Sequence, residues 1–261
     1  MLPVDLIVLA GGRGSRLGGV LKPAVQVAGR SLLSRVLDAR PLAQQAVVVG
    51  PADARPAAID AHGNAVSVIW ALEDPPFGGP VAGLAAGLAA LDAAHETTRL
   101  AAPEAAHQAG HDAAHDAAHE ADAPTLDAAD APPLDEPADW VLVLACDLPY
   151  GAEAARTLLT CTSALLQIDD VDQVDGVHFN DYRGRPQWLA ALYRAPALRA
   201  AIARLGDRVD GASMRTLLEG LPLAGLLDES TASADVDTWE DVESSTARLT
   251  GAPDRVARPE E

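Results

Sequence analysis

The chain has 261 residues, enough for one sizeable α/β domain or two small ones. Its formal net charge of −19 disfavours nucleic acid or an anionic membrane as a partner. Two cysteines, Cys146 and Cys161, cannot form a disulfide framework or a C-x-x-C metal site. The sequence has no export signal and no long apolar run, so we expect a cytoplasmic protein that does not span a membrane.

The first predicted element is a buried strand over Leu6–Leu9, which leads into the glycine-dense stretch Leu9–Pro23. Glycine accepts positive φ, so several backbone N–H groups of this turn can point at one small volume that a ligand approaches closely. Arg16 and Lys22 add two positive charges to that volume. The turn therefore predicts a polyphosphate site. The alternative is a glycine-rich surface turn whose basic residues have no binding function.

The spacing in this turn excludes two common phosphate sites. A Walker P-loop needs Gly-Lys followed by Ser or Thr, which the chain lacks. The dinucleotide fingerprint starts to match at Gly12 and Gly14, but Leu17 stands where its third glycine belongs. Gly50 and Pro51 also stand where that fingerprint needs an acidic ribose partner. The order that remains is L-A-G-G-x-x-x-R-L-G-x-x-x-K-P.

Strands and helices alternate along most of the chain, which predicts βαβ units and a mostly parallel sheet. Strands are expected at Leu6–Leu9, Ala46–Val49, Val66–Trp70 and Val141–Leu144, followed by an antiparallel pair at Gly176–Asn180 and Trp188–Arg194. Helices are expected at Ser31–Arg40, Ala52–Ala61, Pro80–Leu91, Ala152–Thr162, Pro196–Leu205, Ser213–Glu219 and Thr238–Arg248. This order predicts a Rossmann-like three-layer α/β/α fold in a single domain over residues 1–250, with a flexible tail at 251–261.

A low-complexity segment over residues 93–138 interrupts this pattern. It consists mainly of Ala, Asp, Glu, His and Pro, and twelve acidic residues but one arginine lie between Asp92 and Asp139. Such a composition buries too little apolar surface to offset the entropy of ordering, so we expect disorder or a loose helix. The segment leaves the sheet edge where strands begin, whereas ligands of open α/β sheets bind beyond the carboxyl ends.

Histidines recur every four residues in this segment, at His107, His111, His115 and His119. On a helix they would share one face, which is a conceivable zinc or nickel site. The alternative is an expanded repeat without chemistry, which we favour because the segment lies away from the expected site.

A second candidate element is the strand that ends in Ala145-Cys146-Asp147-Leu148-Pro149. A carboxylate at the carboxyl edge of a strand, facing a phosphate loop, is where Mg²⁺ shared with substrate phosphates would be held. An aspartate that caps the following turn is the plain alternative for Asp147. Cys146 is interpreted as a small core residue, because nothing near it in sequence would lower the pKa of its thiol.

Together these segments resemble the MobA-like nucleotidyltransferases, the family of the molybdenum cofactor guanylyltransferases. The resemblance is carried by the opening turn, by Gly-Pro-x-Ala-Gly-Leu at 79–84, by Cys-Asp-x-Pro at 146–149 and by Asp235–Thr238. It implies an enzyme that transfers GMP from GTP to molybdenum-bound molybdopterin, with Mg²⁺ as cofactor and pyrophosphate as the second product. Transient contact with molybdoenzymes or insertion chaperones is also implied.

The resemblance also assigns roles to residues. Arg16, Lys22 and Asp147 would be catalytic, with Asp147 and Asp237 holding the metal. Arg183 and Arg185 would lie near the acceptor phosphate. The nucleotide would be held by Leu9, Ala10, Gly11, Gly12, Gly14, Lys22, Asp74, Gly79 and Asp147. Taken alone, Asp74 also fits a plain helix entry.

The chain departs from the family pattern at three positions. Gly50 stands where well-known relatives have an asparagine that contacts the nucleotide, and Asp235 and Asp237 stand where relatives often have Asn. The preference for GTP depends on Cys-Asp-Leu-Pro and Gly-Gly-Pro-Val-Ala-Gly-Leu, which resemble the guanylyl branch. The alternatives are a CTP-dependent molybdopterin cytidylyltransferase, another small-phosphate or sugar-phosphate nucleotidyltransferase, or a non-catalytic cofactor carrier or nucleotide sensor.

Overall fold

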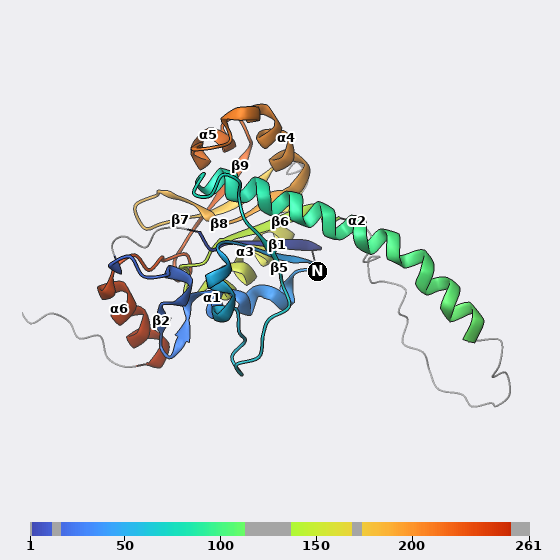
Figure 1. Cartoon of the computed structure of the whole chain (residues 1–261). Coiled ribbons are helices and arrows are strands. Elements are labelled where there is room, and N and C mark those ends of the chain that lie inside the picture. The colour runs from blue at the N-terminus through green and yellow to red at the C-terminus, as the bar shows by residue number, and fades with distance from the viewer. Residues whose placement is uncertain (1, 12–16, 113–136, 169–173, 252–261) are drawn as a thin grey trace, which may run out of the picture.

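The computed structural model describes residues 2–11, 17–112, 137–168 and 174–251, with only the backbone described over 101–112. A seven-stranded sheet lies between two layers of helices, which confirms the expected α/β/α fold (Figure 1). The strands of this sheet are β1 (Val4–Leu9), β4 (Ala46–Val49), β5 (Ile69–Ala71), β6 (Trp140–Ala145), β7 (Gly176–Asn180), β8 (Pro186–Arg194) and β9 (Leu223–Leu227). A separate hairpin pairs β2 (Gln26–Val27) with β3 (Arg30–Ser31).

The strand order is β5-β4-β1-β6-β8-β7-β9. Strand β8 runs antiparallel to both of its neighbours, and every other pairing in this sheet is parallel. The expected antiparallel pairing of β7 and β8 is therefore confirmed. Because β1, β4, β5 and β6 run the same way, the turns after them all lie at one edge of the sheet.

The α-helices are α1 (Leu32–Val36), α2 (Pro80–Asp112), α3 (Gly151–Leu165), α4 (Ala195–Leu205), α5 (Met214–Leu218) and α6 (Trp239–Thr250). The 3₁₀ helices are η2 (Lys22–Ala24), η3 (Leu37–Leu42), η4 (Ala52–Ala57) and η5 (Gly206–Arg208). Helices α1 and α3 cover one face of the sheet, and α2, α4 and α5 cover the other. No helix in the described ranges is long and apolar enough to cross a membrane.

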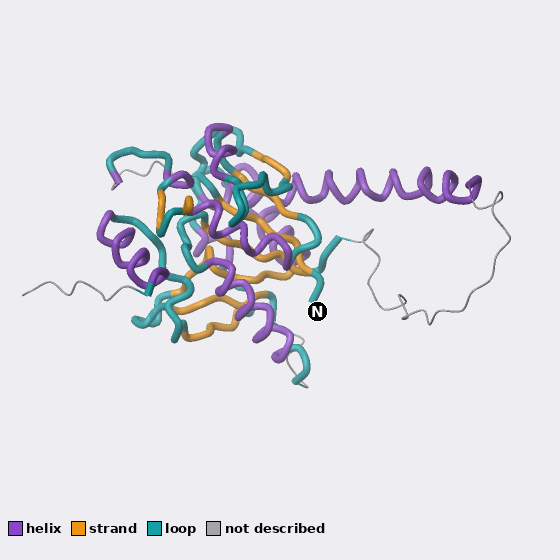
Figure 2. Tube along the Cα trace, turned by 90° about the horizontal axis from the view of Figure 1, so that it is seen from below, coloured by secondary structure: helices purple, strands orange, loops and turns teal. Residues whose placement is uncertain are grey.

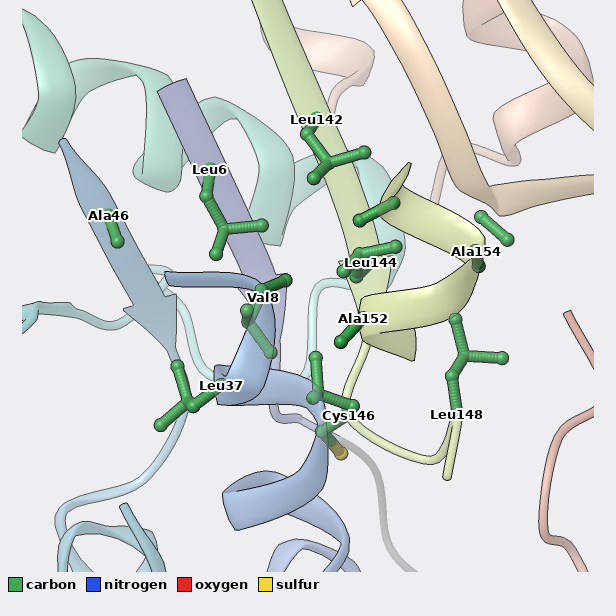
Figure 3. Packing of buried hydrophobic residues seen from close by; sticks show 14 of the residues in the cluster. Leu6, Val8, Leu37, Ala46, Leu142, Leu144, Cys146, Leu148, Ala152 and Ala154 are labelled. Atoms are coloured by element: carbon green, nitrogen blue, oxygen red, sulfur yellow. The ribbon is translucent and has the colours of Figure 1, made fainter. Parts of the chain in front are cut away.

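The sheet is buried on both faces, as its uninterrupted apolar strands predict. In β1, Leu6 and Val8 face α1 and α3, whereas Ile7 and Leu9 face α2. Figure 3 shows the first of these cores, where Leu6, Val8, Leu142 and Leu144 of the sheet meet residues of η3 and α3. Cys146 lies in this core with its thiol free, which agrees with its interpretation as a core residue.

Two expected α-helices differ from the structure. The segment after β4 forms the 3₁₀ helix η4 rather than an α-helix over Ala52–Ala61, because Pro56 has no N–H to donate. The helix expected over Ser31–Arg40 is divided into α1, which Ser31 caps, and η3, which contains Pro41. Proline therefore limits regular helix in both places.

Three strands lie outside the expected set. Strands β2 and β3 have two residues each, which is too short for an alternating pattern to show. Strand β9 contains Gly225 and no β-branched residue, so its composition does not indicate a strand. In addition, β5 begins at Ile69 rather than Val66.

Helix α2 begins at Pro80 as expected but continues past Leu91 to Asp112, into the low-complexity segment. Its C-terminal half runs clear of the other elements in both views, on the side of the chain's N-terminus (Figures 1 and 2). This end is opposite the carboxyl ends of the parallel strands, as expected for the segment. The backbone of His107 and His111 is helical, whereas His115, His119 and the remaining residues to 136 lie outside the described part of the chain.

Candidate active site

The turn after β1 lies between the ends of two neighbouring strands. The N–H of Ala10 donates to the carbonyl of Val49 at 2.7 Å, and the N–H of Cys146 donates to that of Leu9 at 3.0 Å. At Gly50 an added Cβ would lie 2.9 Å from the Cβ of Ala10, so a side chain there would require this turn to move. The close approach explains why this chain has a glycine at position 50.

Lys22, the only lysine of the chain, lies at the centre of this edge. Its Nζ is 2.6 Å from Oδ2 of Asp147 and 2.6 Å from Oδ1 of Asp237. Its side chain is 11 % exposed, in the 3₁₀ helix η2. A backbone hydrogen bond of 3.0 Å from Val236 to Asp147 holds the two aspartate segments together. Three of the residues expected at the site thus meet within ion-pair distance.

Local capping orients the segment that carries Asp237. Thr238 is the N-cap of α6, and its hydroxyl accepts from the N–H of Asp241 in a reciprocal capping box. The carboxylate of Asp241 also accepts from the N–H of Asp237 at 3.0 Å. This cap fixes the backbone next to the ion pair.

The carboxylates control the charge of this cluster. Burial alone would lower the pKa of Lys22, but its hydrogen bonds and charge attraction to Asp147 and Asp237 prevail and raise that pKa above its ordinary value. Burial, together with the negative charges of Asp147 and Asp237, raises the pKa of Asp235. Lys22 is therefore charged at neutral pH, in surroundings that are otherwise negative.

Asp147 offers a carboxylate oxygen to a divalent cation. Its Oδ1 is buried and has no hydrogen-bond partner among the described residues, although its Oδ2 contacts Lys22. Carboxylate oxygen is the ligand type that Mg²⁺ prefers. No group of three or more His, Cys, Asp or Glu in the described ranges could hold a metal by itself, so the fit requires ligands from substrate or water.

Two adjoining cavities open at this edge of the sheet. The first has a volume of about 380 Å³ and extends from Leu9 and Gly11 to Gly79. The second has a volume of about 620 Å³ and lies between β8 and the segment that leads into α5. Both are lined by Pro80, Ala145, Asp147 and Leu189, so they adjoin beside Asp147.

Of the adjacent residues Glu73 and Asp74, only Glu73 lines the first cavity. Glu73 lines this cavity, and its Oε1 accepts from the N–H of Phe77 at 3.1 Å. A Cβ added to Gly11 would lie 3.9 Å from the same Oε1. Asp74 is exposed and lines a separate cavity of about 460 Å³ together with Asp210. Glu73 lines both of these cavities, whereas Asp74 lines only the separate one.

The second cavity is lined by a cation that no sequence motif indicated. Arg215 of α5 lines it together with Asp147 and Asp235. Arg183 and Arg185 lie instead in the β7–β8 turn and do not line either cavity. There the carboxylate of Asp181 accepts from both backbone N–H groups and from the Nε of Arg185. Arg215 has no local sequence signal, because it is one exposed position in an ordinary short helix.

The described residues do not include every expected site residue. Leu9, Ala10, Gly11 and Gly79 lie at the first cavity or in the turn beside it. The expected roles of Gly12, Gly14 and Arg16 fall outside the described part of the chain.

Comparison with known proteins supports a nucleotide-dependent site. Residues 6–224 match the family model described as the MobA-like NTP transferase domain. No curated protein matches the sequence.

Similar solved structures include molybdopterin-guanine dinucleotide biosynthesis protein A from Archaeoglobus fulgidus, at 17 % identity and a TM-score of 0.56 over 95 % of this chain and 99 % of that one. A nucleotidyl transferase from Methanothermobacter is similar at 16 % identity and a TM-score of 0.55, over 96 % and 99 % of the two chains. A 2-C-methyl-D-erythritol 4-phosphate cytidylyltransferase from Thermus thermophilus is similar at 15 % identity and a TM-score of 0.53, over 95 % and 99 %. At these identities the likeness concerns the fold.

Proposed function

Because this chain belongs to the family of MobA-like NTP transferase domains, we propose that it transfers the guanylyl group of GTP to the terminal phosphate of molybdenum-bound molybdopterin. An oxygen of the acceptor phosphate forms a bond to the α-phosphorus, the bond from that phosphorus to the bridging oxygen breaks, and pyrophosphate leaves. The observation that carries the proposal is Lys22, held between Asp147 and Asp237 where two cavities adjoin.

In this proposal the two cavities hold the two substrates. GTP occupies the first cavity, with its phosphates at the turn after β1, and the acceptor occupies the second. Phosphoryl-group transfer needs mainly positioning and stabilisation of charge, so no covalent enzyme intermediate is required. Backbone N–H groups of the turn, including that of Gly11, bind phosphate oxygens. Arg16 would neutralise the pyrophosphate.

Lys22 stabilises the negative charge that develops on the α-phosphoryl oxygens. An ammonium has three donors, and contacts with Asp147 and Asp237 fix its position before substrate arrives. A fixed charge needs no reorganisation during the reaction, which is the condition under which such groups contribute most. Its raised pKa keeps it protonated.

Mg²⁺ would be held by Asp147 and Asp237, and when bound it would neutralise charge on the nucleotide phosphates. The Oδ1 of Asp147 supports this assignment, because it is buried without a hydrogen-bond partner in the part of the chain that the structure describes. In this proposal each of the two carboxylates both holds Mg²⁺ and positions the ammonium group of Lys22.

Glu73 supports guanine as the base. Guanine presents N1–H and N2–H₂ as donors, and a carboxylate has about four acceptor sites, so Glu73 can accept from the base while it holds the N–H of Phe77. The expected base contact of Asp74 would have to come from a neighbouring cavity. We therefore assign the reading of the base to Glu73.

The test is turnover of the full chain with Mg²⁺, molybdenum-bound molybdopterin and radiolabelled GTP, CTP, ATP or UTP. With GTP we expect release of pyrophosphate and formation of the dinucleotide. With the other nucleotides we expect kcat/KM to be at least about tenfold lower, because a base without the donors of guanine leaves polar groups of the site unpaired. Glu73→Gln should lower kcat/KM for GTP about tenfold or more. A larger loss in Asp74→Asn than in Glu73→Gln would return the base contact to Asp74.

Two outcomes would contradict the proposal. Preferential use of CTP would make the chain a cytidylyltransferase. Tight binding of GTP without pyrophosphate release would favour the carrier or sensor function.

A further inference from the structure

The second cavity combines a moderate volume with an unfavourable charge for a phosphate. Its volume of about 620 Å³ lies within the range of about 300–1,000 Å³ typical of small-molecule sites. Its lining includes the carboxyl groups of Asp147 and Asp235. One ammonium, Lys22, is shared between Asp147 and Asp237, so the cluster with Asp235 stays negative and repels an acceptor phosphate unless a further positive charge in the cavity offsets it.

Arg215 provides that positive charge. In the ranges that the structure describes, it is the one cation lining either of the two cavities. It makes no hydrogen bond or ion pair to any other described residue, whereas Lys22 is engaged by Asp147 and Asp237. A planar guanidinium with several free donors fits a phosphate in two-point contact.

The backbone of α5 at Arg215 is fixed by buried residues that precede and follow it in the sequence. Its neighbour Met214 and the later Leu217 and Leu218 of α5 are buried. The hydroxyl of Ser213 accepts from the N–H of Thr216 at 3.1 Å and caps this helix. Arg215 is therefore exposed on a helix whose backbone is anchored, so ordering it for a ligand costs side-chain freedom alone.

The lining of the second cavity also includes Trp188 of β8. Its indole packs edge-on against the ring of His178, with the centroids 4.5 Å apart at 66°. This contact restrains a flat apolar side chain in the lining, which favours a planar ring system over a polyhydroxylated sugar.

We propose that Arg215 binds the phosphate of the acceptor substrate, and that Trp188 contacts its planar ring. This assignment rests on the proposed function for the existence of an acceptor. It moves acceptor recognition from Arg183 and Arg185, in the β7–β8 turn, to α5 and β8.

The test is saturation kinetics of the full chain, in which the concentration of molybdenum-bound molybdopterin is varied at saturating GTP and Mg²⁺. Arg215→Gln should raise the KM for the acceptor at least about tenfold, since a charge-assisted hydrogen bond is lost. The Kd for GTP, measured by calorimetry without acceptor, should stay within about twofold. Arg215→Lys should recover part of the loss, because it restores the charge without the two-point geometry.

Arg204→Gln serves as the matched control. Arg204 is exposed on α4 and lines neither cavity, so the variant removes one surface charge and should leave both constants unchanged. An unchanged acceptor KM in Arg215→Gln, or an equal loss of GTP affinity, would overturn the assignment. A larger rise of the acceptor KM in Arg183→Gln or Arg185→Gln than in Arg215→Gln would assign the phosphate contact to the β7–β8 turn instead.

The same measurements separate this assignment from the proposed function. If wild type gives no product with the pterin but guanylylates or cytidylylates ribose 5-phosphate, the proposed acceptor is wrong. The variants are then compared on ribose 5-phosphate, where a raised acceptor KM in Arg215→Gln still supports the phosphate contact. Trp188→Leu should raise the acceptor KM for the pterin more than for the sugar phosphate, and equal effects would contradict the ring contact.

Discussion

The position of Lys22 requires a lysine rather than an arginine. Every other fixed cation of the chain is an arginine, and the single lysine lies where two carboxylates approach the same atom. A compact ammonium fits a nearly closed position between two carboxylates, whereas a planar guanidinium is larger and directs its donors in a fork. The charge and the size of the group are thus both set by the site.

Replacing Lys22 by Ala should lower turnover about 10²- to 10³-fold, on the scale of losing one preorganised charge at the reacting centre. Lys22→Arg should fall in the same range, because the charge is kept but its position is not. Initial rates at saturating substrates measure both variants, with an unchanged circular dichroism spectrum as evidence of folding. Near-wild-type rates in Lys22→Ala would remove the residue from the reaction.

The raised pKa of Lys22 gives a stability contribution with a defined pH dependence. Because the folded-state pKa lies above the ordinary value of 10.5, the contribution is complete below that pH and is lost as the pH rises through the folded-state pKa. Selective isotope labelling of lysine gives one side-chain NMR signal, since the chain has one lysine. We expect its titration midpoint above 10.5 in wild type and lower in Asp237→Asn, and a midpoint at or below 10.5 in wild type would contradict the buried ion pair.

At the scale of elements, α2 is fastened to β1 by a buried polar contact. The Nε2 of His95 lies 2.7 Å from Oδ2 of Asp5, and the two side chains are 4 % and 1 % exposed. The other carboxylate oxygen of Asp5 accepts from the N–H of Gln45 at 3.1 Å. The contact therefore joins the helix, the strand and the segment before β4.

His95→Ala should lower the free energy of unfolding by about 3 kcal/mol, because a buried carboxylate loses its side-chain partner. Urea unfolding of the full chain measures the change. His62→Ala is the matched control, since His62 is exposed and we expect a change within about 0.5 kcal/mol. If the double variant Asp5→Asn with His95→Leu is no more stable than His95→Ala, the loss does not come from the unpaired carboxylate.

At the scale of the whole molecule, the low-complexity segment joins the body where its ends are close. His95 contacts Asp5, and Asp5 pairs in register with Val141 of β6, the strand to which the chain returns. Among the α2 residues whose side chains are described, the buried ones, including Leu84, Leu88 and Leu91, lie no further along the helix than His95. Both cavities lie at the opposite edge of the sheet.

Replacing residues 101–136 by about ten glycine and serine residues should therefore preserve both fold and turnover, since such a linker reaches about 30 Å when extended. We expect kcat/KM within about twofold of wild type and a shift in thermal midpoint of a few degrees. Circular dichroism and initial rates measure these quantities. A loss of turnover with intact secondary structure would give the segment a function in catalysis.

Much of the fold could be predicted because its signals are local. The apolar runs of β1, β4 and β6 and the proline at the start of α2 each depend on a few neighbouring residues. Strand β9 and the β2–β3 hairpin could not, because their pairing partners rather than their own composition make them strands. The continuation of α2 beyond Leu91 was likewise not indicated by any apolar periodicity.

For the candidate site, the sequence by itself determined that a glycine-rich turn, a lysine and an aspartate follow the ends of parallel strands, because that information lies within short segments. Only the tertiary structure decided that Lys22 contacts Asp147 and Asp237 together, that Glu73 rather than Asp74 lines the first cavity, and that Arg215 lines the second. These relations join residues far apart in the chain, or depend on the direction of a single side chain in a loop. Packing sets both, and local pattern contains neither.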